Sequence, residues 1–354
     1  MRRIIAIADR AALFSLKAIV ALNVLFFLGF LLVALIVAGR ADAAETCTGT
    51  DLTATLRKDD PAGFRKIEAE AAATPNGEGL LWKLERPGQA PSWLFGTMHL
   101  TDPRVTTLPP AAQKAFDAAG ILVIETTEVL DQAKMMATLA KEPDLMMFTD
   151  GTTLPSLLSP RDAALMDEGL AARGIPPASV AKMKPWMLSA MVALPACEMA
   201  RKAGGAPVLD VKLAEDAKAA GKDVDGLETV ADQLRAMASL PIALHMKGLV
   251  ETLKLGDKAA DISETMVALY QQGKVGMIWP LLRAAVPDEA DDPASYAAFE
   301  EAMVTSRNKV MAEHALPILA HGNVFMAVGA LHLPGADGLV EQFRKDGYTV
   351  TRAD

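Results

Sequence analysis

The chain has 354 residues, of which 51% are apolar, and it carries a formal net charge of −9 at neutral pH. This length suggests two domains or one large domain, and apolar residues spread along the whole chain exclude a disordered or low-complexity protein. Residues 1–43 hold five basic and two acidic side chains, which leaves the remainder at −12 and argues against nucleic acid as a partner.

The chain begins with basic residues followed by a long apolar segment. Ala18–Gly39 contains no charged side chain, and Ala41-Asp42-Ala43 follows it. This layout is typical of a secretory signal peptide, but the 22 residues of the apolar segment also suffice to span a bilayer, which takes about 20. We therefore interpret residues 1–43 as a signal peptide or, through residues 18–39, an inner-membrane anchor. Residues 44–354 are then an exported domain, either periplasmic or anchored in the inner membrane and facing the periplasm.

The chain contains two cysteines, Cys47 and Cys197. In an oxidising compartment an even count favours one disulfide bond, which here would join the start of the exported domain to a central helix. A loop of this length would contribute roughly 4–5 kcal/mol in the chain-entropy model. The alternative is two unpaired, buried thiols.

The first part of the exported domain is predicted to contain both helices and strands. A polar helix spans Leu52–Ala72, and a hairpin joins Gly79–Leu84 to Ser92–Gly96. A helix over Ala111–Ala119 leads into Gly120–Glu125, a buried strand with a carboxylate at its end. The order strand, helix, strand predicts that the strands on either side of the helix form a parallel, neighbouring pair.

The middle of the chain is predicted to be mostly helical. A helical insertion covers about residues 129–205, with breaks at its proline- and glycine-rich stretches. A helix over Leu209–Ala220 and a short strand near Lys222–Gly226 follow, and further helices continue as far as Leu282.

The C-terminal part repeats the strand, helix, strand order. A long helix from Ala294 to Ala320 precedes a buried strand over Val324–Gly329, and a helix ending at Lys345 leads to a last strand over Tyr348–Thr351. The predicted fold class is therefore α/β (α+β): a central mixed sheet built from two βαβ-like halves, with a large helical insertion and an N-terminal hydrophobic helix.

The two halves share a motif. Gly96-Thr97-Met98-His99 and Gly329-Ala330-Leu331-His332 each follow an apolar strand and read Gly-x-x-His. Glycine at a strand end permits close approach of another segment, and the histidine is presented at the carboxyl end, where ligands bind in parallel sheets. The other histidines, His245, His314 and His321, lie on helical stretches and are interpreted as packing or surface residues.

Acidic and basic residues add to these two histidines. Glu125 ends the strand predicted to neighbour the one carrying His99, and a carboxylate there needs a partner or a metal ion to offset its desolvation. The alternative is an ion pair with Arg307 or a lysine, and Glu128 could take its place. Arg307 and Asn308 could bind a substrate carboxylate, could steady Glu125, or could lie on a solvated helix face.

Two imidazoles and a carboxylate can bind a divalent transition metal with open positions. We expect His99, His332 and Glu125 to be its ligands, with a spare carboxylate acting as general base during attack of water on a carbonyl. No motif for a serine nucleophile, a zinc-binding His-Glu-x-x-His or a phosphate-binding loop occurs in the sequence.

Several short stretches, taken in order and spacing, carry a family resemblance over most of residues 47–352. They are Leu81–Leu84, Ser92–Leu100, Glu125, Pro207–Asp210, Leu227–Thr229 with Gln233, Ser306–Asn308, and Val328–Gly335 with Gly338 and Gly347-Tyr348. In these stretches the chain resembles the TraB/GumN family, which includes the TIKI proteases. The resemblance implies a fold related to the erythromycin-esterase and ChaN-like group.

The resemblance also implies a peptidase-like, metal-dependent hydrolase that uses manganese, cobalt or zinc. His99 and His332 would be the motif histidines, Glu125 the glutamate, and Glu228 a weaker choice for it. We therefore expect a hydrolase of the bacterial cell envelope that acts on a peptide or small-molecule substrate. The alternative is a non-catalytic envelope binding or accessory protein linked to polysaccharide export or peptide signals; haem or iron handling rests on fold likeness alone.

Overall fold

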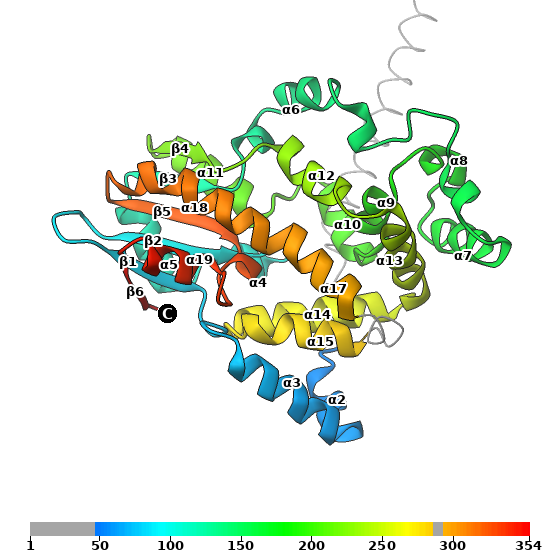
Figure 1. Ribbon diagram of the computed structural model, residues 1–354, viewed down its shortest axis with the longest axis horizontal. Coiled ribbons are helices and arrows are strands. Elements are labelled where there is room, and N and C mark those ends of the chain that lie inside the picture. The colour runs from blue at the N-terminus through cyan, green and yellow to red at the C-terminus, as the bar shows by residue number, and fades with distance from the viewer. Residues whose placement is uncertain (1–46, 286–292) are drawn as a thin grey trace, which may run out of the picture. The chain divides into compact units, whose positions relative to one another are not determined.

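The computed structural model describes residues 47–285 and 293–354, which belong to one unit, Cys47–Asp354 (Figure 1). The predicted signal peptide or anchor over residues 1–43, and with it the N-terminal hydrophobic helix, lies outside the described residues. Within the part that is described, no helix combines the length and apolar character needed to cross a membrane.

A mixed sheet of six strands forms the centre of this unit, as the sequence predicts. The strands are β1 Leu81–Glu85, β2 Ser92–Thr97, β3 Ile121–Ile124, β4 Asp223–Gly226, β5 Val324–Gly329 and β6 Thr349–Arg352. Their order across the sheet is β4-β3-β5-β2-β1-β6. The first four strands in this order run parallel, whereas β1 is antiparallel to both of its neighbours.

The prediction that the Glu125 strand neighbours the His99 strand is wrong, because β5 lies between β3 and β2. Residues 324–328 of β5 are fully buried, and a strand that is apolar on both faces is most stable in the middle of a parallel sheet. The true order pairs the two Gly-x-x-His strands directly, with Thr97 opposite Gly329. The α/β interpretation therefore holds, but the strands of each βαβ-like half are separated by others.

Helices cover both faces of the sheet. Because side chains alternate along a strand, Leu122 and Ile124 of β3 pack on one face and Val123 on the other. The first face is covered by α3 Pro61–Ala73, α5 Pro110–Ala118, α11 Leu209–Ala219, α14 Lys258–Gln271 and α15 Ile278–Ala285. The second face is covered by α18 Ser306–Leu319 and α19 Leu339–Lys345.

The remaining helices lie mainly in the predicted helical insertion and just after the short strand β4. They are α2 Thr53–Asp59, α4 Pro103–Thr106, α6 Gln132–Leu139, α7 Pro160–Ala171, α8 Pro177–Val180, α9 Pro185–Val192, α10 Ala196–Ala203, α12 Val230–Ala238, α13 Ile242–Leu255 and α17 Pro293–Glu300. Residues of α7, α8, α9 and α13 share a small hydrophobic core of their own. The insertion and the later helices thus pack together beside the sheet (Figure 1).

Two predicted helices are interrupted. The predicted helix over Leu52–Ala72 breaks at Asp60, whose side chain caps α3 by accepting a hydrogen bond from the Gly63 amide. The predicted helix from Ala294 to Ala320 is continuous in direction but contains one π-helical segment, η5 Glu301–Thr305, between α17 and α18. Such π turns within helices are frequent at functional sites.

The predicted disulfide bond between Cys47 and Cys197 is confirmed. Cys197 lies in α10 and is buried, and the bond spans a sequence separation of 150 residues. It joins the first described residue to α10, the helix that also binds the loop after β2 through Glu198 and Thr101.

Candidate functional site

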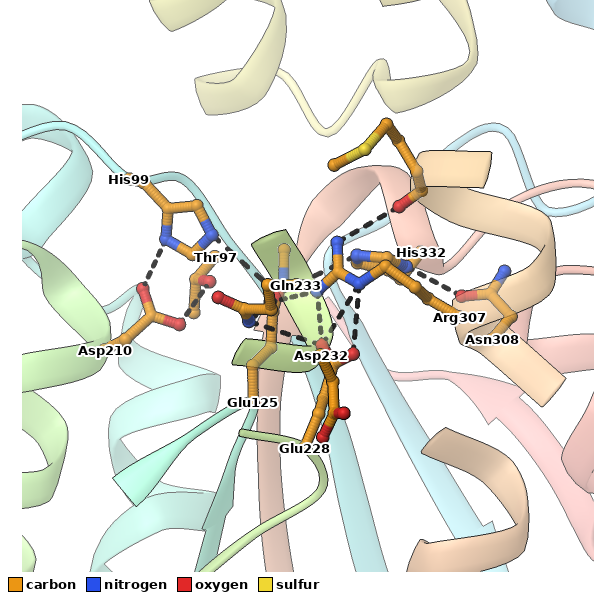
Figure 2. A network of polar contacts seen from close by, with 12 residues as sticks. Thr97, His99, Glu125, Asp210, Glu228, Asp232, Gln233, Arg307, Asn308 and His332 are labelled. Carbon is orange, nitrogen blue, oxygen red and sulfur yellow. Dashed lines mark hydrogen bonds and ion pairs between the residues drawn. The ribbon is translucent and has the colours of Figure 1, made fainter. Parts of the chain in front are cut away.

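The two motif histidines and Glu125 meet at the carboxyl ends of three adjacent strands (Figure 2). His99 follows β2, His332 ends the short helical turn η6 Ala330–His332 after β5, and Glu125 follows β3. The Nε2 atoms of His99 and His332 lie 3.7 and 3.8 Å from the same atom, Oε1 of Glu125. The structure therefore brings together the three residues that the sequence analysis proposed as metal ligands.

His99 is held by a carboxylate on a helix. Its Nδ1 lies 3.1 Å from Oδ2 of Asp210, whose other oxygen accepts a hydrogen bond of 2.9 Å from the Thr97 hydroxyl. Burial lowers the pKa of His99, but the Asp210 and Glu125 carboxylates outweigh it and raise this pKa well above its usual value. The side chain is nevertheless 57% exposed, so water screens part of this effect.

His332 is buried and held by an amide. Its Nδ1 lies 2.7 Å from Oδ1 of Asn308, while the Asn308 amide nitrogen donates to the Asp337 carbonyl. Since an amide oxygen can only accept, His332 donates from Nδ1, and the lone pair of its Nε2 faces Glu125. Burial lowers the pKa of His332 to about 4, so the ring is neutral at physiological pH.

Glu125 is the best-connected residue of the site. Oε1 accepts a hydrogen bond of 2.7 Å from the Gly329 amide, and Oε2 accepts bonds from Arg307 at 2.7 Å and from Gln233 at 3.0 Å. Burial would raise the pKa of Glu125, but its interactions with the neighbouring His99 and Arg307 hold it well below its usual value. Glu125 is therefore ionised at neutral pH.

Arg307 joins two buried carboxylates. Its Nε donates to both oxygens of Glu228 at 3.1 Å, its terminal nitrogens reach Glu125 and the Met303 carbonyl, and its side chain is only 12% exposed. Of the roles considered for Arg307, steadying Glu125 is the one that these contacts support. The ion pair considered as the alternative for Glu125 thus exists beside the two imidazoles.

Glu228 and Glu128, the two alternatives to Glu125 as the acidic metal ligand, do not take that place. Glu228 is paired with Arg307 and also accepts a hydrogen bond from Gln233. It therefore holds the two side chains that themselves bind Glu125. Glu128 does not reach the imidazoles: its Oε2 accepts a bond from the Val230 amide at the start of α12. Among the described residues, Glu125, Asp210 and Glu228 each have hydrogen-bond partners, and the carboxylate that would act as general base stays a prediction.

Three contributors had no role in the sequence analysis. Asp210 and Gln233 stand in stretches that carry the family resemblance, but only the fold shows that they contact His99 and Glu125. Tyr270 of α14 donates to the Gly96 carbonyl and so fixes the end of β2. The interpretation of His245 and His314 as packing residues fits their bonds to backbone carbonyls.

The loop after His99 is fastened to the helix that carries the disulfide. Both the amide and the hydroxyl of Thr101 donate to the buried carboxylate of Glu198 in α10, at 2.6 and 2.9 Å. Lys202 of the same helix donates to the His99 carbonyl at 3.2 Å. The disulfide at Cys197 therefore reinforces a helix that positions the first motif histidine.

A preformed metal-binding group is not present in residues 47–285 and 293–354, where no set of three or more histidine, cysteine, aspartate or glutamate side chains has the required arrangement. The donor set nevertheless suits an ion. Each Nε2 atom lies further from Oε1 of Glu125 than a hydrogen-bonded atom would, yet within twice the usual ion–ligand distance of about 2.0–2.2 Å. Each imidazole also has its Nδ1 fixed by an oxygen, as metal-ligating histidines usually do.

Comparison with known proteins places these residues in a family context. The model of the TraB/PrgY/gumN family matches residues 80–352. Metalloprotease TIKI2 of Danio rerio is 25% identical over 320 residues, covering 76% of this chain and 60% of that protein. Metalloprotease TIKI1 of Danio rerio is 24% identical over 334 residues, covering 82% of this chain and 65% of that protein. The chain thus spans about three fifths of the length of these curated relatives, and no solved structure matches it.

Proposed function

The chain belongs to the TraB/PrgY/gumN family, and from this we propose that it is a metal-dependent hydrolase that cleaves peptide bonds. The names of its metalloprotease relatives support the reaction class. The observation that carries the proposal is the convergence of the Nε2 atoms of His99 and His332 on one carboxylate oxygen of Glu125. The Nε2 lone pair of His332 and the ionised Glu125 oxygen face each other without a proton between them, which favours a cation there.

The charge of the surrounding groups supports the same cation. Glu125, Glu228 and Asp210 contribute three carboxyl groups, which outnumber the guanidinium group of Arg307 and the imidazole of His99. The raised pKa of His99 is a further sign that this negative charge attracts positive charge to the centre. Manganese, cobalt and zinc all accept imidazole and carboxylate ligands.

In this proposal each residue has a defined task. His99, His332 and Glu125 would hold the ion, which when bound would supply Lewis-acid polarisation of the substrate carbonyl. Asp210 and Asn308 orient the two imidazoles, and Arg307 keeps Glu125 ionised and in place. Because His99 is the exposed member of the set, the substrate would approach from its side.

Metal content and peptide cleavage, measured together, test the proposal. The full chain is equilibrated with manganese, cobalt or zinc, and the bound metal is measured by plasma mass spectrometry. We expect about one ion per chain, loss of that ion in the double variant His99→Ala with His332→Ala, and retention in His321→Ala, a matched control because His321 is exposed at the end of α18. Cleavage of a mixed peptide library should require the metal and stop on addition of a chelator.

Two outcomes would contradict the proposal in different ways. Full metal content in the double variant would show that His99 and His332 are not the metal ligands. Metal binding without cleavage of any peptide would instead support a non-catalytic binding or accessory protein of the cell envelope.

We also propose that the protein is exported, with residues 18–39 available as a membrane anchor. The disulfide between Cys47 and Cys197 supports this, because disulfides persist in oxidising compartments such as the periplasm. In cells, we expect both cysteines to resist alkylation until a reductant is added. Free thiols in a cytoplasmic fraction would contradict export.

A further inference from the structure

A cavity separate from the candidate metal centre lies among the helices beside the sheet. It has a volume of about 320 Å³ and is lined by residues of α9, α12, α13, α15 and α17. Its lining includes small residues, among them Ser189, Ala190 and Gly248. Small side chains at these positions leave space that larger ones would fill.

The lining of this cavity also contains aromatic residues. Trp279 packs edge-on against Tyr296 and Phe299, with ring centroids 5.6 and 6.3 Å apart. Trp186 packs against His245 at 4.7 Å, and Nε2 of His245 lies 2.8 Å from the Met237 carbonyl, which fixes that ring. Ligand pockets of this size with mainly apolar and aromatic walls bind apolar groups, and a cavity of only about 150 Å³ already holds benzene.

Two helical elements connect this cavity to the candidate metal centre. In α12, Gln233 donates to Glu125, and Met237, one turn further on the same face, lines the cavity. The continuous helix made of α17, η5 and α18 carries Phe299 in the cavity wall and Arg307 in the centre (Figure 1). At 1.5 Å per residue, these separations along the helices are roughly 6 and 12 Å.

A smaller cavity gives a third connection. It has a volume of about 210 Å³, and its lining includes both Trp279, which also borders the larger cavity, and Asn308, which holds His332. The aromatic cavity and the centre are therefore neighbours through side chains as well as through shared helices.

We propose that the aromatic cavity is a specificity pocket that takes an aromatic or large aliphatic side chain of the peptide substrate. This inference rests on the proposed function, since it assigns the cleaved bond to the centre at His99, Glu125 and His332. Because the cavity and the centre share helices and the lining residue Trp279 also borders a cavity lined by Asn308, one extended peptide can reach both.

Filling the cavity tests the proposal. A Cβ atom at Gly248 would meet nothing within 4 Å, so the variant Gly248→Leu can be built into α13 with its side chain occupying free space. The replacement also removes a helix-interior glycine, which favours folding. Ala243→Leu is the matched control, because Ala243 lies in the same helix but is exposed outside the cavity.

The probes are octapeptides of alanine in which a single phenylalanine is moved from position to position, with the all-alanine peptide as reference. With the full chain and its metal, we expect kcat/KM to be roughly ten- to a hundredfold higher for the best phenylalanine peptide than for the reference. Gly248→Leu should abolish this preference while leaving cleavage of the all-alanine peptide unchanged, and Ala243→Leu should keep it. A preference that survives in folded Gly248→Leu would overturn the proposal.

Equilibrium binding separates this inference from the proposed function. If the wild-type chain cleaves neither these peptides nor the mixed library, the hydrolase proposal fails, but the quenching of tryptophan fluorescence still reports binding near Trp186 and Trp279. Tighter binding of phenylalanine peptides that Gly248→Leu abolishes would then support the pocket by itself. Equal binding of phenylalanine and alanine peptides to the wild-type chain would overturn it.

Discussion

Arg307 shows how much a single side chain contributes to this centre. It is almost completely buried and pairs with Glu125 and Glu228, which would otherwise lie close together without a positive charge between them. Removing one partner from a buried ion pair is far more destabilising than replacing the whole pair, because the remaining charge stays desolvated. Arg307 therefore supports both the fold and the position of Glu125.

We predict that Arg307→Met lowers the free energy of unfolding by about 3–5 kcal/mol. Adding Glu228→Gln to this variant should restore part of the loss, because it removes one of the two unpaired carboxylates. Urea denaturation followed by circular dichroism measures both effects. Equal stability of wild type and Arg307→Met would show that the pair is not the strong contact described here.

Asp102 gives a prediction about pH. Its side chain caps α4 and pairs with Arg104 and more loosely with Arg201. The hydrogen bond from Arg104 lowers the pKa of Asp102, although burial opposes this. Since the folded-state pKa lies below the unfolded one, the stabilisation is complete above the ordinary value of 3.8 and is lost as the pH falls through the folded-state pKa.

We expect Asp102→Asn to be less stable than wild type by about 1–2 kcal/mol at pH 7, and the difference to shrink as the pH falls below about 4. Urea unfolding curves at several pH values, recorded for both proteins, measure this difference. A gap that stays constant down to pH 3 would contradict the assignment of this pKa to Asp102.

The sequence alone identifies the site residues at strand ends but not those on helices. His99, His332 and Glu125 each follow a short apolar run, and that local pattern is enough to place them at strand ends. Asp210 and Gln233 lie in helices whose local pattern is that of ordinary amphipathic segments. Their contacts with His99 and Glu125 arise from how helices pack on the sheet, which no local pattern contains.

At the scale of elements, the two motif glycines allow neighbouring segments to touch. A Cβ atom on Gly96 would lie 2.8 Å from the Leu333 side chain and 3.0 Å from Ala330, which are closer than normal contacts. A Cβ atom on Gly329 would lie 3.1 Å from Oε1 of Glu125. The glycines thus let the ends of β2 and β5 approach each other and the carboxylate.

We predict that Gly96→Val destabilises the protein by about 1–3 kcal/mol, even though valine favours strands over glycine. The added methyl groups should displace the turn that carries His332, so metal affinity should fall as well. Thermal unfolding and metal titration measure the two effects. Gly151→Val serves as control, since a Cβ atom there meets nothing within 4 Å; equal behaviour of the two variants would argue against the close approach.

Elements themselves are easier to predict from sequence than their order. The strands, the hairpin and the helices over 111–119 and 209–220 occur close to the predicted bounds, because their apolar periodicity is local. The position of β5 between β3 and β2 depends on pairing between strands more than 200 residues apart, which no local pattern contains. From local order alone, β3 is therefore expected beside β2. Single breaks such as the π turn η5 depend on neighbouring helices in the same way.

At the scale of the whole molecule, the disulfide closes a loop that contains the first half of the site. We predict that replacing Cys47 and Cys197 together by serine lowers the free energy of unfolding by about 2–5 kcal/mol. Reductant should destabilise the wild type by a similar amount and leave the double variant unchanged, as denaturant titration can show. A wild type that is indifferent to reductant would contradict a structural role for this bond.

Because β5 lies in the middle of the sheet but late in the chain, the candidate site is completed only near the end of synthesis. Chains are made from the N-terminus, and β5, with His332 behind it, is among the last segments to leave the ribosome. Until it inserts between β2 and β3, the sheet has a gap and the first imidazole has no counterpart. A nascent chain, or one truncated before β5, therefore lacks His332 and has only one of the two imidazoles that meet at Glu125.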